Sequence, residues 1–398
     1  MVNLHKHNMK KLFILLFIQL ALCCTTYAAN YLTFTAEEDN SEFSIRDHNI
    51  KSKIFYSLDN GKTWNKLTAQ LVNLAKGEQA LLKGEEPDEK PTLDNYSSFR
   101  MTGAIAASGS VMSLIDGNGE GKTIPYEYCF QGLFAGCIGL TKAPELPATT
   151  LTERCYHAMF RYCTNLTKAP ELPATTLAES CYEEMFRDCL SLTKAPELPA
   201  TTLAKSCYDI MFFNCPNLTK APEQLPATTL AESCYQFMFY KCTSLTKAPE
   251  LPATTLADKC YFGMFEGCES LSYVKVAFTE WDDINTIIWL SNVAEEGTFI
   301  CPKKLRLTYG TSNIPDGWTV IREEDSSTEA VAATEGTTVH TSGLTIFVCN
   351  TDADIEVYEV GGKLIGKART MNGEAQMTVP QSGIYLVKAG AQTRKVVL

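Results

Sequence analysis

One phrase of about 26 residues repeats along the middle of the chain, and this repeat constrains the fold more than any other sequence feature. One copy reads LAESCYEEMFRDCLSLTKAPELP, from Leu177 to Pro199. Each copy carries two cysteines eight residues apart, and equivalent cysteines recur every 26 or 27 residues. The first column comprises Cys129, Cys155, Cys181, Cys207, Cys234 and Cys260, and the second comprises Cys137, Cys163, Cys189, Cys215, Cys242 and Cys268. A fixed period of this length is typical of a solenoid, in which each unit buries its apolar face against its neighbours.

Each unit has a first part with helix-like spacing and a second part that is extended. Leu177, Cys181, Met185 and Cys189 recur every four residues, so we expect them to form one face of a short helix. From Leu192, the segment LTKAPELP contains two prolines, which lack an N–H donor and predict a short extended piece. Helices pack about 10 Å apart and strands stack about 4.8 Å apart, so we expect a curved stack with the strands inside. The predicted fold class is an α/β solenoid of the leucine-rich-repeat type, with about six 26-residue units.

The segment CYEEMFRDCLSL resembles the BspA-like leucine-rich repeats of Bacteroidetes surface proteins. Met185 and Phe186 take the places of the Ala-Phe pair of that family, and Cys189 and Leu192 take the places of its Cys and Leu. The period here is longer than the commoner period of the family. The resemblance covers about residues 123–278. It implies a leucine-rich-repeat protein of the cell surface, in an anoxic habitat that suits free thiols.

The cysteine columns are open to three interpretations. Two cysteines eight residues apart on one helix are about 12 Å apart, and equivalent cysteines on adjacent helices are about 10 Å apart. Both distances exceed the limit of about 7 Å between the Cα atoms of a disulfide. Zinc sites need close pairs such as C-x-x-C, which the repeats do not contain. We interpret the columns as small buried apolar residues, with disulfides between neighbouring units as the alternative.

Residues 1–28 have the layout of a secretory signal peptide: a basic segment HKHNMKK, an apolar run LFILLFIQLALCC and small residues near Ala28. A lipid anchor at Cys23 is the alternative. Removing residues 1–28 takes away three lysines and no acid, which moves the formal net charge from −11 to −14. An acidic surface argues against nucleic acid as a partner. No later segment is long and apolar enough to span a bilayer, so we expect an exported protein, at the cell surface or extracellular.

The segment before the repeats is rich in strand signals. In residues 29–122, the stretch SLDNGKTW contains an Asn-Gly turn, which predicts a hairpin. The same stretch matches the Asp-box pattern S-x-D-x-G-x-T-W of sialidase propellers, where it is a structural hairpin. We interpret this region as an N-terminal β-sandwich-like domain that caps the solenoid. Residues 279–322 predict the C-terminal cap, and residues 323–343 are polar and predict a linker.

Residues 344–398 contain short, evenly spaced strand segments, which predict an Ig-like β-sandwich. The segments IEVYEVGGKLIGKA and GIYLVKAGAQTRKVVL resemble the C-terminal sorting domain of type IX secretion in Bacteroidetes. That resemblance implies a module that addresses the protein to the cell surface. Attachment through this module, lipid attachment and a soluble protein all remain open.

Variation between the units is concentrated in the predicted helix, at the third and sixth residues after the first cysteine. Ile210 and Phe213 occupy these positions in one unit, and Phe237 and Tyr240 occupy them in the next. On a helix these positions lie on one face, so we expect the four residues to form an exposed apolar and aromatic patch across two units. Large exposed patches mark interaction sites, and this patch is the predicted ligand-binding site. The alternatives are that another segment covers the patch or that these positions vary freely.

The extended part of the unit hardly varies, and it repeats a lysine and a glutamate. The lysines are Lys142, Lys168, Lys194, Lys220 and Lys247, and the glutamates are Glu145, Glu171, Glu197, Glu223 and Glu250. One interpretation is a solvated ladder of charges that contributes little to stability. The other is a repetitive surface for a repetitive ligand such as a polysaccharide, which gains avidity from many weak contacts.

Catalytic and metal sites have little support in the sequence. The three histidines after residue 28 fall in different predicted domains, and no nucleophile elbow, phosphate-binding loop or H-E-x-x-H is present. The stretch DGNGEGKTIPYE places Asp116, Asn118, Glu120 and Glu127 at calcium-loop spacing, but it lacks flanking helices and favours a glycine-rich turn. We expect no enzyme activity, no cofactor and no metal.

The function that these features predict is that of an exported, adhesin-like, surface leucine-rich-repeat protein. Its solenoid would bind a host or bacterial surface protein or glycan, and we expect it to be a monomer. Two alternatives stay open: a structural surface spacer without a discrete ligand, and a module that captures glycans. The sequence does not identify the partner.

Overall fold

The computed structural model describes residues 29–48, 53–282 and 284–323, and it describes seven short ranges after them. These ranges are 338–342, 345–349, 354–359, 363–371, 374–380, 384–389 and 392–397. The chain divides into two compact units between Asp325 and Ser326. The predicted signal peptide and most of the predicted linker lie outside the described residues. Five residues of that linker prediction, Thr338–Ser342, form a strand.

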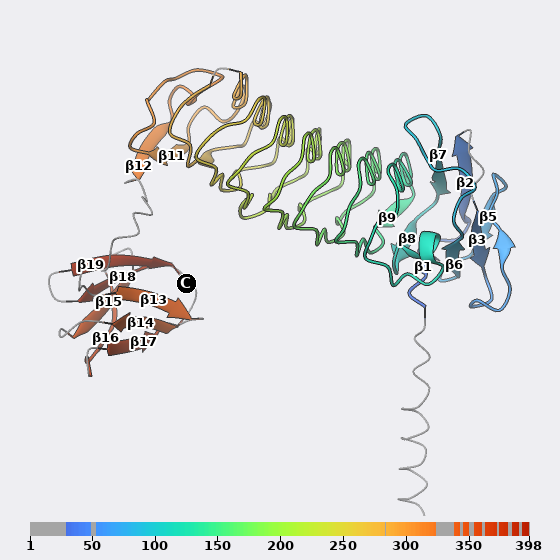
Figure 1. The fold of residues 1–398 in the computed structure, drawn as a ribbon, viewed down its shortest axis with the longest axis horizontal. Coiled ribbons are helices and arrows are strands. Elements are labelled where there is room, and N and C mark those ends of the chain that lie inside the picture. The colour runs from blue at the N-terminus through green and yellow to red at the C-terminus, as the bar shows by residue number, and fades with distance from the viewer. Residues whose placement is uncertain are drawn as a thin grey trace, which may run out of the picture. The chain divides into compact units, whose positions relative to one another are not determined.

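The first unit begins with two sheets (Figure 1). The first has the strand order β4-β3-β6-β1-β8-β9, and the second has the order β5-β2-β7. The strands are β1 (Leu32–Ala36), β2 (Ser41–His48), β3 (Ile54–Ser57), β4 (Asn65–Lys66), β5 (Val72–Leu74), β6 (Gln79–Gly84), β7 (Tyr96–Thr102), β8 (Ile105–Ser108) and β9 (Leu140–Lys142). Phe34 of β1 meets Phe43 of β2 with ring centroids 5.2 Å apart, so the two sheets pack on each other through buried aromatic side chains.

The first sheet leads directly into the repeats. Strand β9 belongs to the first repeat and pairs in parallel with β8, so the sheet continues into the repeated region. The one α-helix of the described residues, α2 (Ser113–Asp116), is a single turn between β8 and the repeats. The Ser113 hydroxyl donates to the Leu82 carbonyl of β6 and accepts from the Leu32 amide of β1, which fixes this turn to the sheet.

The predicted α/β solenoid is wrong, because the repeats form neither helices nor a continuous inner strand ladder. The described strands make five separate small sheets, and between β9 and β10 (Tyr273–Lys275) the repeats share only isolated bridges such as Lys194 with Lys220. We call each 26-residue unit a layer, named by its first cysteine, and the stretch between its two cysteines its turn segment. Figure 1 shows the layers side by side in a row.

The backbone of a turn segment alternates between two kinds of hydrogen bond. In the Cys181 layer, the amides of Met185 and Arg187 donate three residues back, to the carbonyls of Tyr182 and Glu184. The amides of Glu184 and Phe186 donate instead to the next layer. Every fourth residue has a left-handed backbone, with φ of 50° at Ser180, 54° at Glu184 and 59° at Asp188. A right-handed helix cannot contain such residues, so each segment is a chain of four-residue turns.

The turn segment forms no helix because its apolar residues recur every four residues, whereas a helix has 3.6 residues per turn. A helix turns about 100° per residue, so positions four apart drift by about 40° at each step. From Leu177 to Cys189 that drift would reach about 120°, whereas a chain of four-residue turns keeps these positions on one side. The burial of the segment follows the period of four: Cys181, Tyr182, Met185 and Phe186 are buried, and the two residues after each pair are partly exposed.

Two columns of stacked aromatic rings run through the layers. Successive rings of the tyrosine column lie 5.7–6.0 Å apart, and those of the phenylalanine column lie 5.4–5.6 Å apart. The first column is Phe130, Tyr156, Tyr182, Tyr208, Tyr235 and Tyr261, and the second is Phe134, Phe160, Phe186, Phe212, Phe239 and Phe265. The layers are joined by direct backbone hydrogen bonds, so the helix spacing of about 10 Å that predicted curvature does not apply.

The last layer is closed by a small parallel sheet and two tryptophans. Strand β10 pairs with β11 (Thr298–Pro302), and β11 pairs with β12 (Thr319–Glu323). Trp289 is fully buried against Tyr261 and Phe265, the last rings of the two columns. Trp281 packs on Trp289 and Phe299, so the cap covers the end of the aromatic core.

The second unit has its own core between two antiparallel sheets. One sheet has the order β13-β14-β17, and the other has the order β16-β15-β18-β19. The strands are β13 (Thr338–Ser342), β14 (Thr345–Cys349), β15 (Ile355–Glu359), β16 (Leu364–Ala368), β17 (Glu374–Thr378), β18 (Ile384–Ala389) and β19 (Gln392–Val397). Ile346 and Val348 of β14 and Ile355 and Val357 of β15 are fully buried in one cluster.

Candidate interaction surface

The four predicted site residues come together on the turn segments of two adjacent layers. The rings of Phe213 and Tyr240 stack with centroids 4.4 Å apart, and Phe237 meets Tyr240 edge to face at 5.6 Å. Ile210 occupies the position of Phe237 one layer earlier, and its amide donates to the Gln236 carbonyl beside Phe237. All four side chains are half-buried, not exposed on a helix face, and Ile210 and Phe237 have left-handed backbones with φ of 58° and 48°.

The group of rings extends into a third layer through a residue that the sequence reading missed. Phe262 meets Phe237 edge to face, with centroids 5.0 Å apart. Phe213, Phe237, Tyr240 and Phe262 are called the aromatic cluster below. Gly263 makes room for it, because a Cβ atom on Gly263 would lie 2.2 Å from the Phe237 ring. The glycine was the available sequence signal, since the four layers before it carry larger residues at that position.

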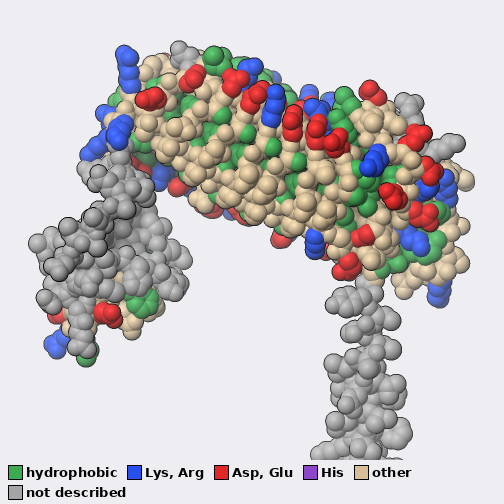
Figure 2. All heavy atoms as spheres, viewed as in Figure 1, with side chains coloured by type: hydrophobic (Ala, Val, Ile, Leu, Met, Phe, Trp, Pro, Cys, Tyr) green, Lys and Arg blue, Asp and Glu red, His purple; other side chains and the backbone are tan. Residues whose placement is uncertain are grey.

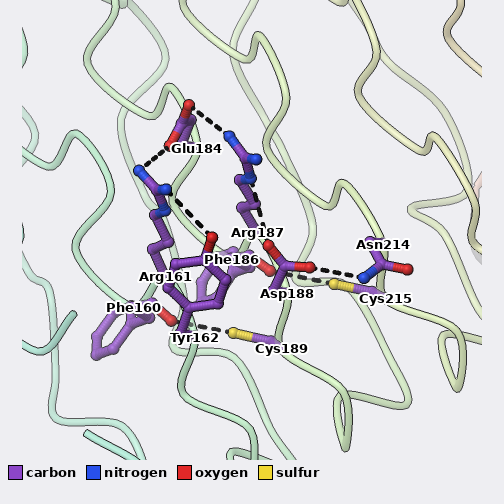
Figure 3. A network of polar contacts seen from close by, with 10 residues as sticks. All are labelled: Phe160, Arg161, Tyr162, Glu184, Phe186, Arg187, Asp188, Cys189, Asn214 and Cys215. Carbon is purple, nitrogen blue, oxygen red and sulfur yellow. Dashed lines mark hydrogen bonds and ion pairs between the residues drawn. The ribbon is translucent and has the colours of Figure 1, made fainter. Parts of the chain in front are cut away.

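A network of charged side chains, which Figure 3 shows, lies beside the aromatic cluster. The guanidinium groups of Arg161 and Arg187 both bind the Glu184 carboxylate, at 2.9 Å and 3.0 Å. Arg187 also contacts Asp188, whose other oxygen accepts from the Asn214 amide at 2.6 Å. The Arg187 guanidinium lies 5.1 Å from the centre of the Phe213 ring, so the network and the cluster form one continuous surface.

A second cation contacts the cluster. The Lys241 ammonium is 5.2 Å from the centre of the Tyr240 ring. A cation at this distance from a ring face is attracted by its quadrupole, by about 0.5–1 kcal/mol at an exposed site. The aromatic cluster therefore contacts two cations, Arg187 and Lys241. Figure 2 shows acidic and basic side chains gathered along one edge of the row of layers, with hydrophobic side chains beside them.

The cysteines are structural, and the thirteen for which the structure describes side chains are all free. Each thiol of the second column donates a hydrogen bond to a phenylalanine carbonyl of the preceding layer, or to Phe99 in the first case, at 3.0–3.2 Å. Burial raises the pKa of the Cys155 and Cys207 thiols to about 12. Metal ligands and nucleophiles are thiolates, so these buried thiols suit neither role.

The loops that resembled functional motifs are held by their own hydrogen bonds. Asp59 of the Asp-box stretch accepts from the Thr63 amide at 2.8 Å and the Thr63 hydroxyl at 2.7 Å. The Asp116 carboxylate accepts from the amides of Asn118, Gly119 and Gly121, so backbone donors occupy the carboxylate that stands at calcium-loop spacing. In the part of the chain that the structure describes, no group of three or more His, Cys, Asp or Glu side chains could hold a metal ion.

The lysine and glutamate columns line a groove on the extended parts of the first layers. The groove has a volume of about 690 Å³ and is lined by Lys142, Pro144, Glu145, Lys168 and Glu171, among others. Within the two columns and among the described residues, the one ion pair joins Lys194 and Glu197 at 4.0 Å. The side chains of that pair are more than half exposed, so the charges are mostly solvated.

Comparisons with known proteins leave the family open. The chain matches no protein-family model and no curated protein. The resemblances to BspA-like repeats and to a sorting domain therefore stay predictions. Among the described residues, no helix has the length and the apolar character needed to cross a bilayer.

Proposed function

We propose that this protein is an exported surface protein, adhesin-like, that binds a partner protein through the turn segments of its Cys207, Cys234 and Cys260 layers. The observation that carries the proposal is the aromatic cluster, four half-buried rings in contact across three layers. Protein interfaces are enriched in aromatic and arginine side chains at their centres, and Arg187 stands beside Phe213. The signal-peptide layout of residues 1–28 supports export.

The geometry also explains how such a surface would be selective. Turn segments carry the residues that differ between layers, while the buried columns hold the layers in register. The rings are fixed by stacking on one another and by backbone bonds between layers, so little side-chain freedom is lost on binding. A partner that covers Phe237 and Tyr240 would bury their exposed parts against a rigid platform.

The test is a binding screen of residues 29–398 on arrays of matrix proteins, mucins and glycans, run with two variants. Phe237→Ala removes the central ring of the cluster, and we expect it to weaken binding of a protein hit by about 30-fold or more, as hot-spot residues do. Tyr309→Ala is the matched control, because Tyr309 is an aromatic residue that is 49% exposed in the cap. A protein hit that both variants retain at full affinity would contradict the proposal.

A second candidate function, glycan capture, is favoured by the groove of the lysine and glutamate columns. Its lining repeats from layer to layer, so a linear polymer could repeat its contacts and gain avidity. The pair Lys142→Ala and Lys168→Ala should then abolish binding of a glycan hit while Phe237→Ala leaves it intact. No binding at all on the arrays would count against both candidates and favour the alternative of a structural surface spacer.

A further inference from the structure

Four side chains in successive layers keep a buried polar atom without a hydrogen-bond partner among the described residues. They are Oε1 of Gln131, Nδ1 of His157, Oε2 of Glu183 and Oδ1 of Asp209. Each is the second residue after the first cysteine of its layer, so they occupy one column. Unpartnered buried polar atoms are rare in folded proteins, and a row of four calls for a physical explanation.

Backbone bonds set Glu183 and Asp209 side by side. The Glu184 amide donates to the Asp209 carbonyl at 2.9 Å, which fixes the two layers at the spacing of neighbouring strands, about 4.8 Å. Asp209 is only 7% exposed. Its Oδ2 accepts from the Gln236 amide of the following layer at 3.3 Å, which leaves Oδ1 without a donor.

The nearby cations contact other carboxylates. Arg161 and Arg187 both bind Glu184, and the Arg154 Nε atom lies 3.6 Å from Glu153. The Nε atoms of Arg154 and Arg161 are buried without a hydrogen-bond partner among the described residues. His157 faces Glu183 and Glu184, but burial lowers the pKa of its imidazole, so this ring stays neutral near pH 7. The groups that act on Asp209 are thus two carboxylates on one side, Glu183 and Glu184, and a neutral amide on the other, Gln236.

The unpartnered oxygens of Asp209 and Glu183 lie on adjacent layers, and neither accepts a hydrogen bond from a donor among the described residues. We propose that Asp209 keeps its proton in the folded protein at neutral pH and donates it to Glu183, and that the stack loses stability as rising pH removes this proton. A carboxyl group that keeps its proton donates to its neighbour, whereas two carboxylates at this spacing would repel each other without solvent to screen them.

The electrostatics agree with this geometry and set the direction of the effect. Burial, followed by the neighbouring Glu183, raises the pKa of Asp209 from 3.8 to about 8. Between about pH 4 and pH 8 the folded protein holds a proton that the unfolded chain releases, so stability falls as the pH rises through that window. Above pH 8 both states are ionised and the loss is complete. The unpartnered histidine acts in the opposite direction, and only below its usual pKa of about 6.5.

The decisive variant is Asp209→Asn in the full mature chain. The amide has the shape of the protonated acid and donates to Glu183 at every pH, so we expect a melting temperature that is higher than that of the parent at pH 8.5 and depends less on pH. Glu183→Gln should flatten the profile as well, and the double variant should flatten it no further. Glu171→Gln, on the exposed ladder, is the control and should leave the profile unchanged.

The protonation state of the Asp209 carboxyl group can also be measured directly, beside the stability measurements. The side-chain carboxyl carbon of Asp209, followed by NMR in the folded protein, should titrate with a midpoint near 8 and not near 3.8. An infrared band of a protonated carboxyl group should be present at pH 7 in the parent and absent in Asp209→Asn. The proposal is overturned if Asp209 titrates below pH 5 or if Asp209→Asn leaves the pH dependence of melting unchanged.

Discussion

At the scale of single residues, the second column of cysteines shows why this side chain recurs in every layer. The Cys189 thiol donates to the Phe160 carbonyl at 3.1 Å, and its fully buried sulfur fills the space beneath the phenylalanine column. The residue is therefore both a small apolar group and a donor. The sequence reading predicted the burial but not the hydrogen bond, because it placed the cysteines on helices about 10 Å apart.

Replacing Cys189 separates these two roles. Cys189→Ala loses the donor and part of the volume, and we expect the free energy of unfolding to fall by about 1–3 kcal/mol. Cys189→Ser keeps a donor of similar size and should recover part of that loss. Urea unfolding of the two variants measures the difference. If Ser destabilises the protein as much as Ala does, the thiol serves only to fill space.

Asp59 gives a second prediction, and it concerns acid. The backbone amide and hydroxyl of Thr63 and the Ser57 hydroxyl lower the pKa of the Asp59 carboxyl to about 2. A depressed carboxyl pKa contributes stability that is present above the unfolded value of 3.8 and is lost as the pH falls through about 2. Asp59→Asn should therefore melt lower than the parent at pH 6, and the difference in melting temperature should shrink as the pH falls to 2. Equal melting temperatures at pH 6 would contradict this.

At the scale of elements, the turn segment depends on positions that accept a left-handed backbone. Glycine, asparagine and aspartate accept it readily, and Asn214, Gly263 and Gly267 occupy such positions. Ile210 and Phe237 occupy them as well, at a local cost of about 1 kcal/mol each or more. Stacked rings and bonds between layers offset that cost.

Gly263 has a left-handed backbone and also lies against the Phe237 ring of the candidate site. Gly263→Ala places a Cβ atom 2.2 Å from the Phe237 ring, so the ring must move and the aromatic cluster must open. We expect both a loss of stability of about 1–3 kcal/mol and a clear loss of partner binding. Gly136→Ala is the control, because Gly136 also has a left-handed backbone, with φ of 73°, and its Cβ atom would meet nothing within 4 Å. Similar losses of binding in both variants would count against a role for Phe237.

The sequence predicted the units and the grouping of the site residues, but not the elements. Equivalent positions recur every 26 or 27 residues, which places Phe213 beside Tyr240 whatever the local conformation, so the four residues come together although no helix forms. The period of four was visible in the sequence, but the left-handed backbone was not. A residue such as Ile210 favours a right-handed backbone by itself, and hydrogen bonds to the neighbouring layers override that preference. Phe262 and Asp209 were missed because they stand one position before the positions that were compared.

At the scale of the whole molecule, each layer contacts only the layers before and after it, so layers should be separable units. Deleting residues 177–202 removes the Cys181 layer and leaves the aromatic cluster intact. Deleting residues 230–255 removes the Cys234 layer, with Phe237 and Tyr240. We expect both proteins to fold with the circular dichroism of the parent, and only the second to lose partner binding. Unfolding of either protein would show that the stack is one cooperative unit without separable layers.

Deleting residues 177–202 also tests the proposed proton on Asp209, in a protein that carries no point substitution. Without the Cys181 layer, Asp209 no longer faces Glu183, and its neighbour in the column becomes His157. An imidazole can take the proton that Asp209 releases and then carry the opposite charge, so the pair attracts where the original pair repelled. The shortened protein should therefore lose less stability than the parent between pH 5.5 and pH 8.5, although it has fewer layers. A pH profile parallel to that of the parent would place the titrating group outside this column.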